Sequence, residues 1–166
     1  MSTTARSILS ILLLILLAIP SGCSSIRSPR FESVGVREVE HTDARTVYSF
    51  AVTATNPNKE PIPLKQVTYT VTLNDGSSTP YTFTGVRSPE TTLHTYAQHT
   101  FELPAVFDIT PDQLAGVIDY TIRGSTKYLK PGKLNEVLFD SKISVPKAEF
   151  TLRGKVNVDQ PTQMTE

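Results

Sequence analysis

The sequence predicts an all-β protein, an antiparallel sandwich of two sheets with about seven strands. Short stretches of the chain alternate apolar with polar residues, and β-branched and aromatic residues are common in these stretches. Pairs that favour turns, such as Asn56-Pro57 and Asp75-Gly76, lie between them. Alternation with a period of two is typical of a strand that has one buried face and one face in water.

The clearest strand is expected over residues 66–73, where Val67, Tyr69 and their alternate neighbours face one way and threonines face the other. Asp75-Gly76 follows directly and supplies the positive φ of a tight turn. Similar but shorter patterns predict six further strands, at residues 34–36, 48–54, 81–83, 97–103, 118–122 and 147–153. Seven antiparallel strands with a wet outer face favour two sheets packed against each other.

One short helical turn is expected after the fifth strand. Thr110-Pro111-Asp112-Gln113 combines an N-cap threonine, a proline at the first helical position and a glutamine that completes a capping box. Gly116 would end this helix after about one turn.

The most distinctive connection is Asn56-Pro57-Asn58, with Pro61 and Pro63 after it. Pro57 disfavours helix at Asn56 and ends the strand before it. The two later prolines cannot donate to a sheet ladder and hold an extended edge. The segment therefore predicts a rigid connection between two strands.

The first part of the chain has the plan of a secretory signal peptide. Arg6 is the only charged side chain before twelve mostly apolar residues at positions 8–19, and Ser21 and Gly22 follow them. A basic start, an apolar core of this length and small residues before the cleavage point are typical of export signals. The apolar run is shorter than the roughly 20 residues that a membrane-spanning helix needs. We therefore expect residues 1–22 to be a signal peptide and leave them out of the fold.

Cys23 is the only cysteine of the 166 residues, which excludes a disulfide within the chain. With Ser21 and Gly22 it resembles the lipobox of bacterial lipoproteins, although Pro20 stands where that motif usually has an aliphatic residue. The resemblance implies that the thiol of Cys23 is acylated and that this residue begins the mature protein. It places the protein in the cell envelope, lipid-anchored to a membrane and facing the periplasm or the exterior. The alternative is ordinary cleavage near Gly22, which would leave a free thiol able to form a dimer.

Without residues 1–22 the chain keeps 15 basic and 16 acidic side chains, because only Arg6 is lost. This near balance argues against nucleic-acid binding, which depends on a strongly basic surface. Residues 119–155 nevertheless carry eight Lys or Arg against four acids. We expect these side chains on the outer faces of strands in water; weak attraction to an anionic membrane or partner is the alternative.

The sequence offers no motif for catalysis, for a cofactor or for a metal. It contains no Gly-x-Ser-x-Gly, no His-Glu-x-x-His, no phosphate-binding glycine loop and no Cys-x-x-Cys. His41, His94 and His99 are its only histidines, and on one extended strand the side chains of His94 and His99 would point to opposite faces. We therefore expect no enzyme, no cofactor, no metal site and no small-molecule substrate.

Most of the chain from residue 31 to residue 156 resembles one family of folded domains. The residues that carry the resemblance are the strand end and Asn-Pro-Asn at 54–58, the segment 61–64 and the alternating stretch 67–76. They are similar to the WHy (water stress and hypersensitive response) domain of the atypical, folded late-embryogenesis-abundant proteins (LEA type 2, desiccation-related). Residues 118–124 resemble that family's tyrosine-bearing strand, and residues 77–80 depart from its pattern. On this basis residues 23–30 are expected to be a tether, 31–156 the domain and 157–166 a disordered tail.

The resemblance implies a fibronectin-III-like β-sandwich without an active site, and an association with desiccation, freezing or other stress. The expected function is that of a membrane-anchored, non-enzymatic protein that protects client proteins or the envelope. The alternative is an envelope lipoprotein that acts as an accessory module and binds another envelope protein through a sheet edge or a loop surface. A large exposed apolar patch would favour this alternative, because fold alone does not fix function.

Overall fold

Eight strands and one helix account for most of the described residues. The structure is a computed structural model, and it describes residues 26–158 except 43, 77–78, 111–113 and 115. The strands are β1 (Arg30–His41), β2 (Thr46–Thr55), β3 (Ile62–Asn74), β4 (Tyr81–Arg87), β5 (Thr91–Leu93), β6 (Gln98–Phe107), β7 (Gly116–Tyr128) and β8 (Lys147–Val158). The helix is α2 (Lys133–Asp140), which lies between β7 and β8.

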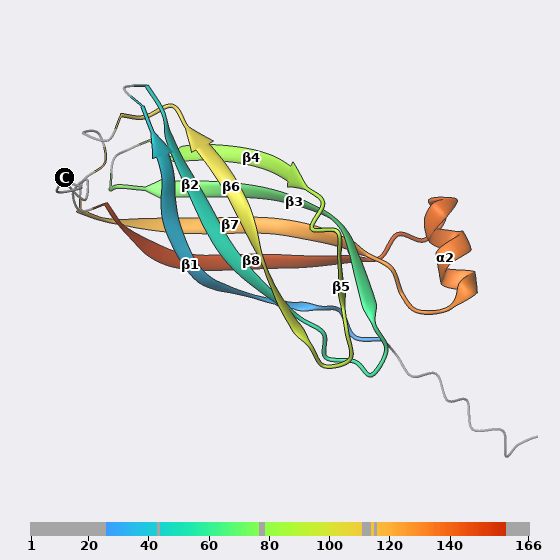
Figure 1. Cartoon of the computed structure of the whole chain (residues 1–166). Coiled ribbons are helices and arrows are strands. Elements are labelled where there is room, and N and C mark those ends of the chain that lie inside the picture. Colours follow the sequence, from blue (N-terminus) through green and yellow to red (C-terminus); the bar gives the residue numbers. More distant parts are fainter. Residues whose placement is uncertain (1–25, 43, 77–78, 111–113, 115, 159–166) are drawn as a thin grey trace, which may run out of the picture.

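The strands form two antiparallel sheets that face each other (Figure 1). One sheet has the order β1-β2-β6; the other has the order β4-β3-β7-β8, with the short β5 paired to the start of β3. At the two sides of the sandwich, β1 lies beside β8 and β6 beside β4. The predicted all-β antiparallel sandwich is therefore confirmed with its seven strands, and β5 is an eighth among the described residues.

The core is made by the inward faces of both sheets. In β3 the side chains of Val67, Tyr69 and Val71 are buried and the threonines between them are not, as the alternation predicts. Phe50 of one sheet meets Tyr120 of the other edge-on, with ring centroids 5.0 Å apart. Burial of each large apolar side chain stabilises the fold by about 1.5–3 kcal/mol, so this alternation holds the two sheets together.

Two glycines of the larger sheet make room for aromatic rings on neighbouring strands. Gly124 pairs with Tyr69 on β3 and with Phe150 on β8, and Gly154 pairs with Tyr120. A Cβ on Gly124 would come within 2.7 Å of Phe150 Cε2, because the ring occupies the space above the glycine. The ring of Tyr120 lies over Gly154 in the same way. The aromatic side chains thus cover backbone that glycine leaves bare, and the inner layer is filled.

Two strands depart in detail from the sequence pattern. In β1 the pairing with β2 shifts at Val34, which leaves this side chain 58% exposed instead of in the core. A β-bulge of this kind adds one residue and turns it out of the ladder. In β6 the strand begins at Gln98, after Ala97, and its buried face starts at Phe101, so the side chain of His99 is exposed.

The described residues contain one helix, which lies between β7 and β8. The turn predicted at residues 110–113 falls largely on 111–113, which lie outside the described residues. The described helix is α2, which the sequence pattern does not predict. The N-cap residue of α2 is Gly132, which has no side chain to cap the helix. None of the residues of α2 is buried. No helix among the described residues is long and apolar enough to cross a membrane.

Candidate functional site

The connection between β2 and β3 is held by the side chains of Asn56 and Asn58, both of them buried. Asn56 Nδ2 lies 2.8 Å from the carbonyl oxygen of Glu60, 3.0 Å from that of Leu93 and 2.9 Å from that of His94. Asn56 Oδ1 accepts the backbone N–H and the side-chain amide of Asn58, each at 2.9 Å. Because buried amides need partners, these contacts explain why asparagine stands here: it joins its own connection to the backbone at Leu93 and His94.

Asn58 also binds the beginning of the described chain. Its Oδ1 accepts the backbone N–H of Arg27 at 2.8 Å, and its Nδ2 donates to the carbonyl oxygen of Arg27 at 2.8 Å. Next to this pair, Ser28 Oγ lies 3.1 Å from Tyr128 Oη at the end of β7, and Ile26 packs against the core. Part of the expected tether is therefore bonded to the sandwich, which the sequence pattern did not indicate.

These contacts lie at one end of the sandwich, which we call the proximal end. It comprises residues 26–29, the connection 56–61 and the crossover 129–146 that carries α2. In Figure 1 the crossover and the start of the described chain lie at the same end of the strands, and α2 stands clear of both sheets. Leu129 N donates to the carbonyl oxygen of Pro63 at 3.0 Å, which fixes the start of the crossover to β3.

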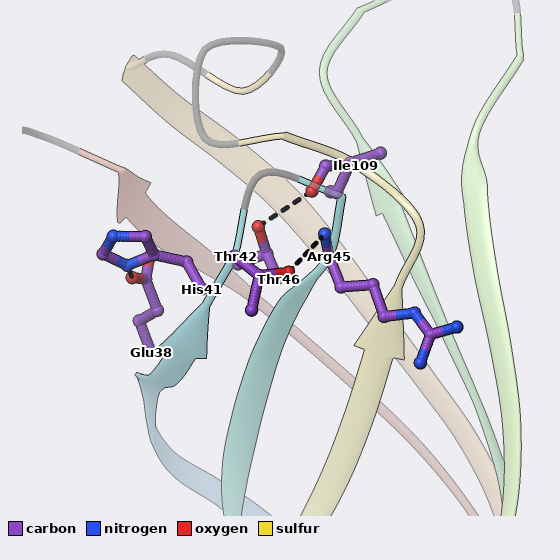
Figure 2. A network of polar contacts seen from close by, with 6 residues as sticks. All are labelled: Glu38, His41, Thr42, Arg45, Thr46 and Ile109. Carbon is purple, nitrogen blue, oxygen red and sulfur yellow. Dashed lines mark hydrogen bonds and ion pairs between the residues drawn. The ribbon is translucent and has the colours of Figure 1, made fainter.

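The opposite, distal end carries the turn between β1 and β2 (Figure 2). His41 Nδ1 lies 2.7 Å from Glu38 Oε1, and Thr46 Oγ1 donates to the carbonyl oxygen of Ile109 at 3.0 Å. An open, shallow pocket of about 460 Å³ lies against this turn, with the following lining residues: Glu40, Thr42, Ala44, Arg45, Val47 and Val106. The two charged side chains of its lining, Glu40 and Arg45, are both exposed.

The three histidines lie in separate places. His41 is at the distal end, the exposed His94 is in the turn after β5, and the exposed His99 is on β6. His94 lies before β6, so His94 and His99 do not share one strand. Within the described ranges, no three His, Cys, Asp or Glu side chains lie close enough to hold a metal ion.

Two tyrosines of the core titrate at high pH. Burial, with a smaller effect of the charge on Glu38, raises the pKa of Tyr48 to about 12. Burial also raises the pKa of Tyr69, against a smaller lowering effect of Arg87. Tyr69 Oη donates to the carbonyl oxygen of Pro104 at 2.5 Å, which links the two sheets. Both hydroxyls point into the sandwich, so we assign them to structure and not to chemistry.

The site residue that the sequence analysis named, Cys23, lies outside the described residues, which begin at Ile26. The feature it missed is the exposed crossover around α2, where Leu134, Val137 and Ile143 are each more than 60% exposed. Alternation of period two cannot find such a segment, because the segment lies outside the sheets.

No family model matches the chain, and no curated protein matches it in sequence. Two solution structures are similar in fold. At2g46140.1, put forward as a late embryogenesis abundant (LEA) protein, gives a TM-score of 0.55 at 17% identity, over 92% of this chain and 84% of its own. AT1g01470 from Arabidopsis thaliana gives 0.57 at 13% identity, over 89% of this chain and 93% of its own. At these identities the likeness is one of fold, and the chain has the β-sandwich fold of an LEA-like protein.

Proposed function

We propose that this chain is a lipid-anchored, non-enzymatic protein of the bacterial cell envelope that protects other proteins or the envelope during drying or freezing. The observation that carries the proposal is the likeness of fold to a protein put forward as LEA, because it extends over 92% of this chain.

The outer face of the larger sheet supports a protective role. Hydroxyl side chains are numerous on it, and Thr70 Oγ1 lies 3.1 Å from Thr84 Oγ1 across β3 and β4. The hydroxyl residues on outward positions are Thr68, Thr70, Thr72, Thr82, Thr84, Thr121, Ser125 and Thr151. A hydroxyl group both donates and accepts, so such a face can replace water at polar client surfaces as they dry.

A drying assay tests the protective role. Residues 24–166 contain every described strand and the whole buried core, so they carry the complete folded unit. We expect a labile enzyme dried or freeze–thawed with this piece to regain more activity than with an equal mass of an unrelated β-sandwich or of albumin. Recovery equal to that with either control would refute protection by this fold.

Cell fractionation tests the anchor. Each buried methylene of an acyl chain contributes roughly 0.8 kcal/mol, and durable anchoring needs at least two such chains or a second membrane contact. We expect Cys23→Ser to move the protein from the membrane fraction to the soluble fraction, with Ser24→Ala as the matched control that stays. Membrane retention of Cys23→Ser equal to that of the unchanged protein would contradict acylation of Cys23.

The second candidate function is that of an accessory module which binds another envelope protein. The observation that favours it is the exposed apolar group on the crossover, Leu134, Val137 and Ile143. Such groups on monomers mark interaction surfaces. A pull-down from envelope extracts that recovers one protein, and loses it when Leu134 and Val137 are replaced by serine, would favour this function over protection.

A further inference from the structure

The crossover at residues 129–146 carries the three most exposed large apolar side chains of the described residues. Leu134 is 72% exposed, Val137 63% and Ile143 75%, and none of the residues of α2 is buried. Leu134, Val137 and Leu138 are spaced i, i+3 and i+4, so they share one face of the helix. An isolated helix of eight residues is marginal in water, and packing usually stabilises it. We therefore expect the exposed apolar face of α2 to pack against a partner.

The charges around this face identify the kind of partner. Lys130, Lys133, Lys142 and Lys147 flank it, against two acids, Glu136 and Asp140. At 100° per residue, Glu136 lies about 160° from Leu134, whereas Asp140 lies about 60° from Val137 and about 20° from Lys133. An apolar face with lysines at its borders is typical of helices that lie in the surface of an anionic bilayer. Four lysines against two acids in this segment favour an anionic partner.

The place of the crossover in the fold gives the second reason. It belongs to the proximal end, where the described chain begins (Figure 1). Both of its ends are fixed there: Leu129 N donates to the carbonyl oxygen of Pro63 at 3.0 Å, and Tyr128 N to that of Pro146 at 3.1 Å. Three peptide steps separate Cys23 from Ile26, which span at most about 11 Å. A lipid on Cys23 would thus hold the proximal end against the membrane surface.

We propose that α2 and its flanking lysines lie on the anionic bilayer that carries the lipid anchor. The inference rests on the proposed anchoring at Cys23. The apolar side chains of α2 enter the boundary between headgroups and acyl chains, and the lysine ammonium groups meet lipid phosphates. On its own this contact is weak. The anchor makes it intramolecular and raises its effective concentration, so that a weak contact becomes occupied.

The experiment uses the single thiol of the chain. Residues 23–166 keep the whole core, and Cys23 can be coupled to maleimide lipid in preformed vesicles, which supplies the anchor without any acylation. The vesicles are phosphatidylcholine alone, or phosphatidylcholine with about one third phosphatidylglycerol. We expect amide hydrogen exchange in residues 129–146 to be roughly tenfold slower on the anionic vesicles than in solution, and less affected on the neutral ones.

Matched variants separate the two parts of the contact. Leu134→Ser with Val137→Ser is expected to abolish the protection, whereas Val86→Ser with Val117→Ser, at sites 60% and 61% exposed, leaves it intact. Lys133→Glu with Lys142→Glu removes the difference between anionic and neutral vesicles, and Arg153→Glu on the sandwich does not.

Three results would overturn the proposal. The first is equal exchange of residues 129–146 in solution and on both kinds of vesicle. The second is protection in solution that grows with protein concentration, which would mean that a second copy covers α2. The third is protection that appears only when envelope proteins are added, which would identify a protein partner. Because coupling replaces acylation, a failure here is distinct from retention of Cys23→Ser in the membrane fraction.

Discussion

Tyr48 is a core residue whose hydroxyl has no hydrogen-bond partner among the described residues. Its pKa is raised to about 12, first by burial and then by Glu38, whereas an unfolded tyrosine titrates near 10. The folded state thus keeps a proton that the unfolded state has lost. We expect the free energy of unfolding to be unaffected by this group below pH 10, and to fall by about 1.4 kcal/mol per pH unit as pH rises from 10 to 12. Urea unfolding across this range measures it.

Substitution by phenylalanine separates this effect from packing. Tyr48→Phe is expected to flatten the loss above pH 10 and to change stability at pH 7 by less than about 1 kcal/mol, because no hydrogen bond from a described residue is lost. Tyr69→Phe, which gives up the bond to the carbonyl oxygen of Pro104, costs about 1 kcal/mol at pH 7. An unchanged slope in Tyr48→Phe would show that other groups cause the alkaline loss.

Among the elements, those with a long local pattern were predictable and the others were not. β3 follows from alternation over residues 66–73, since each inward residue is buried by the opposite sheet. β5 has three residues, which is too few for a period of two to be seen. α2 has no capping side chain, and its apolar spacing extends only from Leu134 to Leu138, which is too short a pattern to predict a helix.

In the candidate site, too, only the features that depend on neighbouring residues could be predicted from the sequence. Asn56-Pro57-Asn58 was predicted as a rigid connection, because Pro57 restricts its own neighbour. The hydrogen bonds of this connection join Asn58 to Arg27, 31 residues before it, and Asn56 to Leu93, 37 residues after it. Such partners depend on which strands the topology brings together, and no local pattern specifies them. The lipid anchor at Cys23 stays a prediction from the sequence.

For the molecule as a whole, the side chain of Asn58 ties the N-terminal segment, residues 26–29, to the proximal end of the sandwich. Its side chain makes both backbone bonds to Arg27 and a third bond to Asn56 Oδ1. We expect Asn58→Ala to lower the free energy of unfolding by about 1–3 kcal/mol, because buried polar groups lose their partners. The exposed Asn157→Ala serves as the control, with a change within about 0.5 kcal/mol.

The two hydrogen bonds between the side chain of Asn58 and the backbone of Arg27, here called the clamp, can be tested separately from global stability. Under native conditions the amide of Arg27 is expected to exchange much faster in Asn58→Ala than in the unchanged protein, while amides in the middle of β2 and β7 slow or quicken only with global stability. Released from the clamp, residues 26–29 can move away from the proximal end, while Arg30 stays paired with Thr55. If the Arg27 amide exchanges at the same rate in both proteins, the side chain of Asn58 does not hold the N-terminal segment.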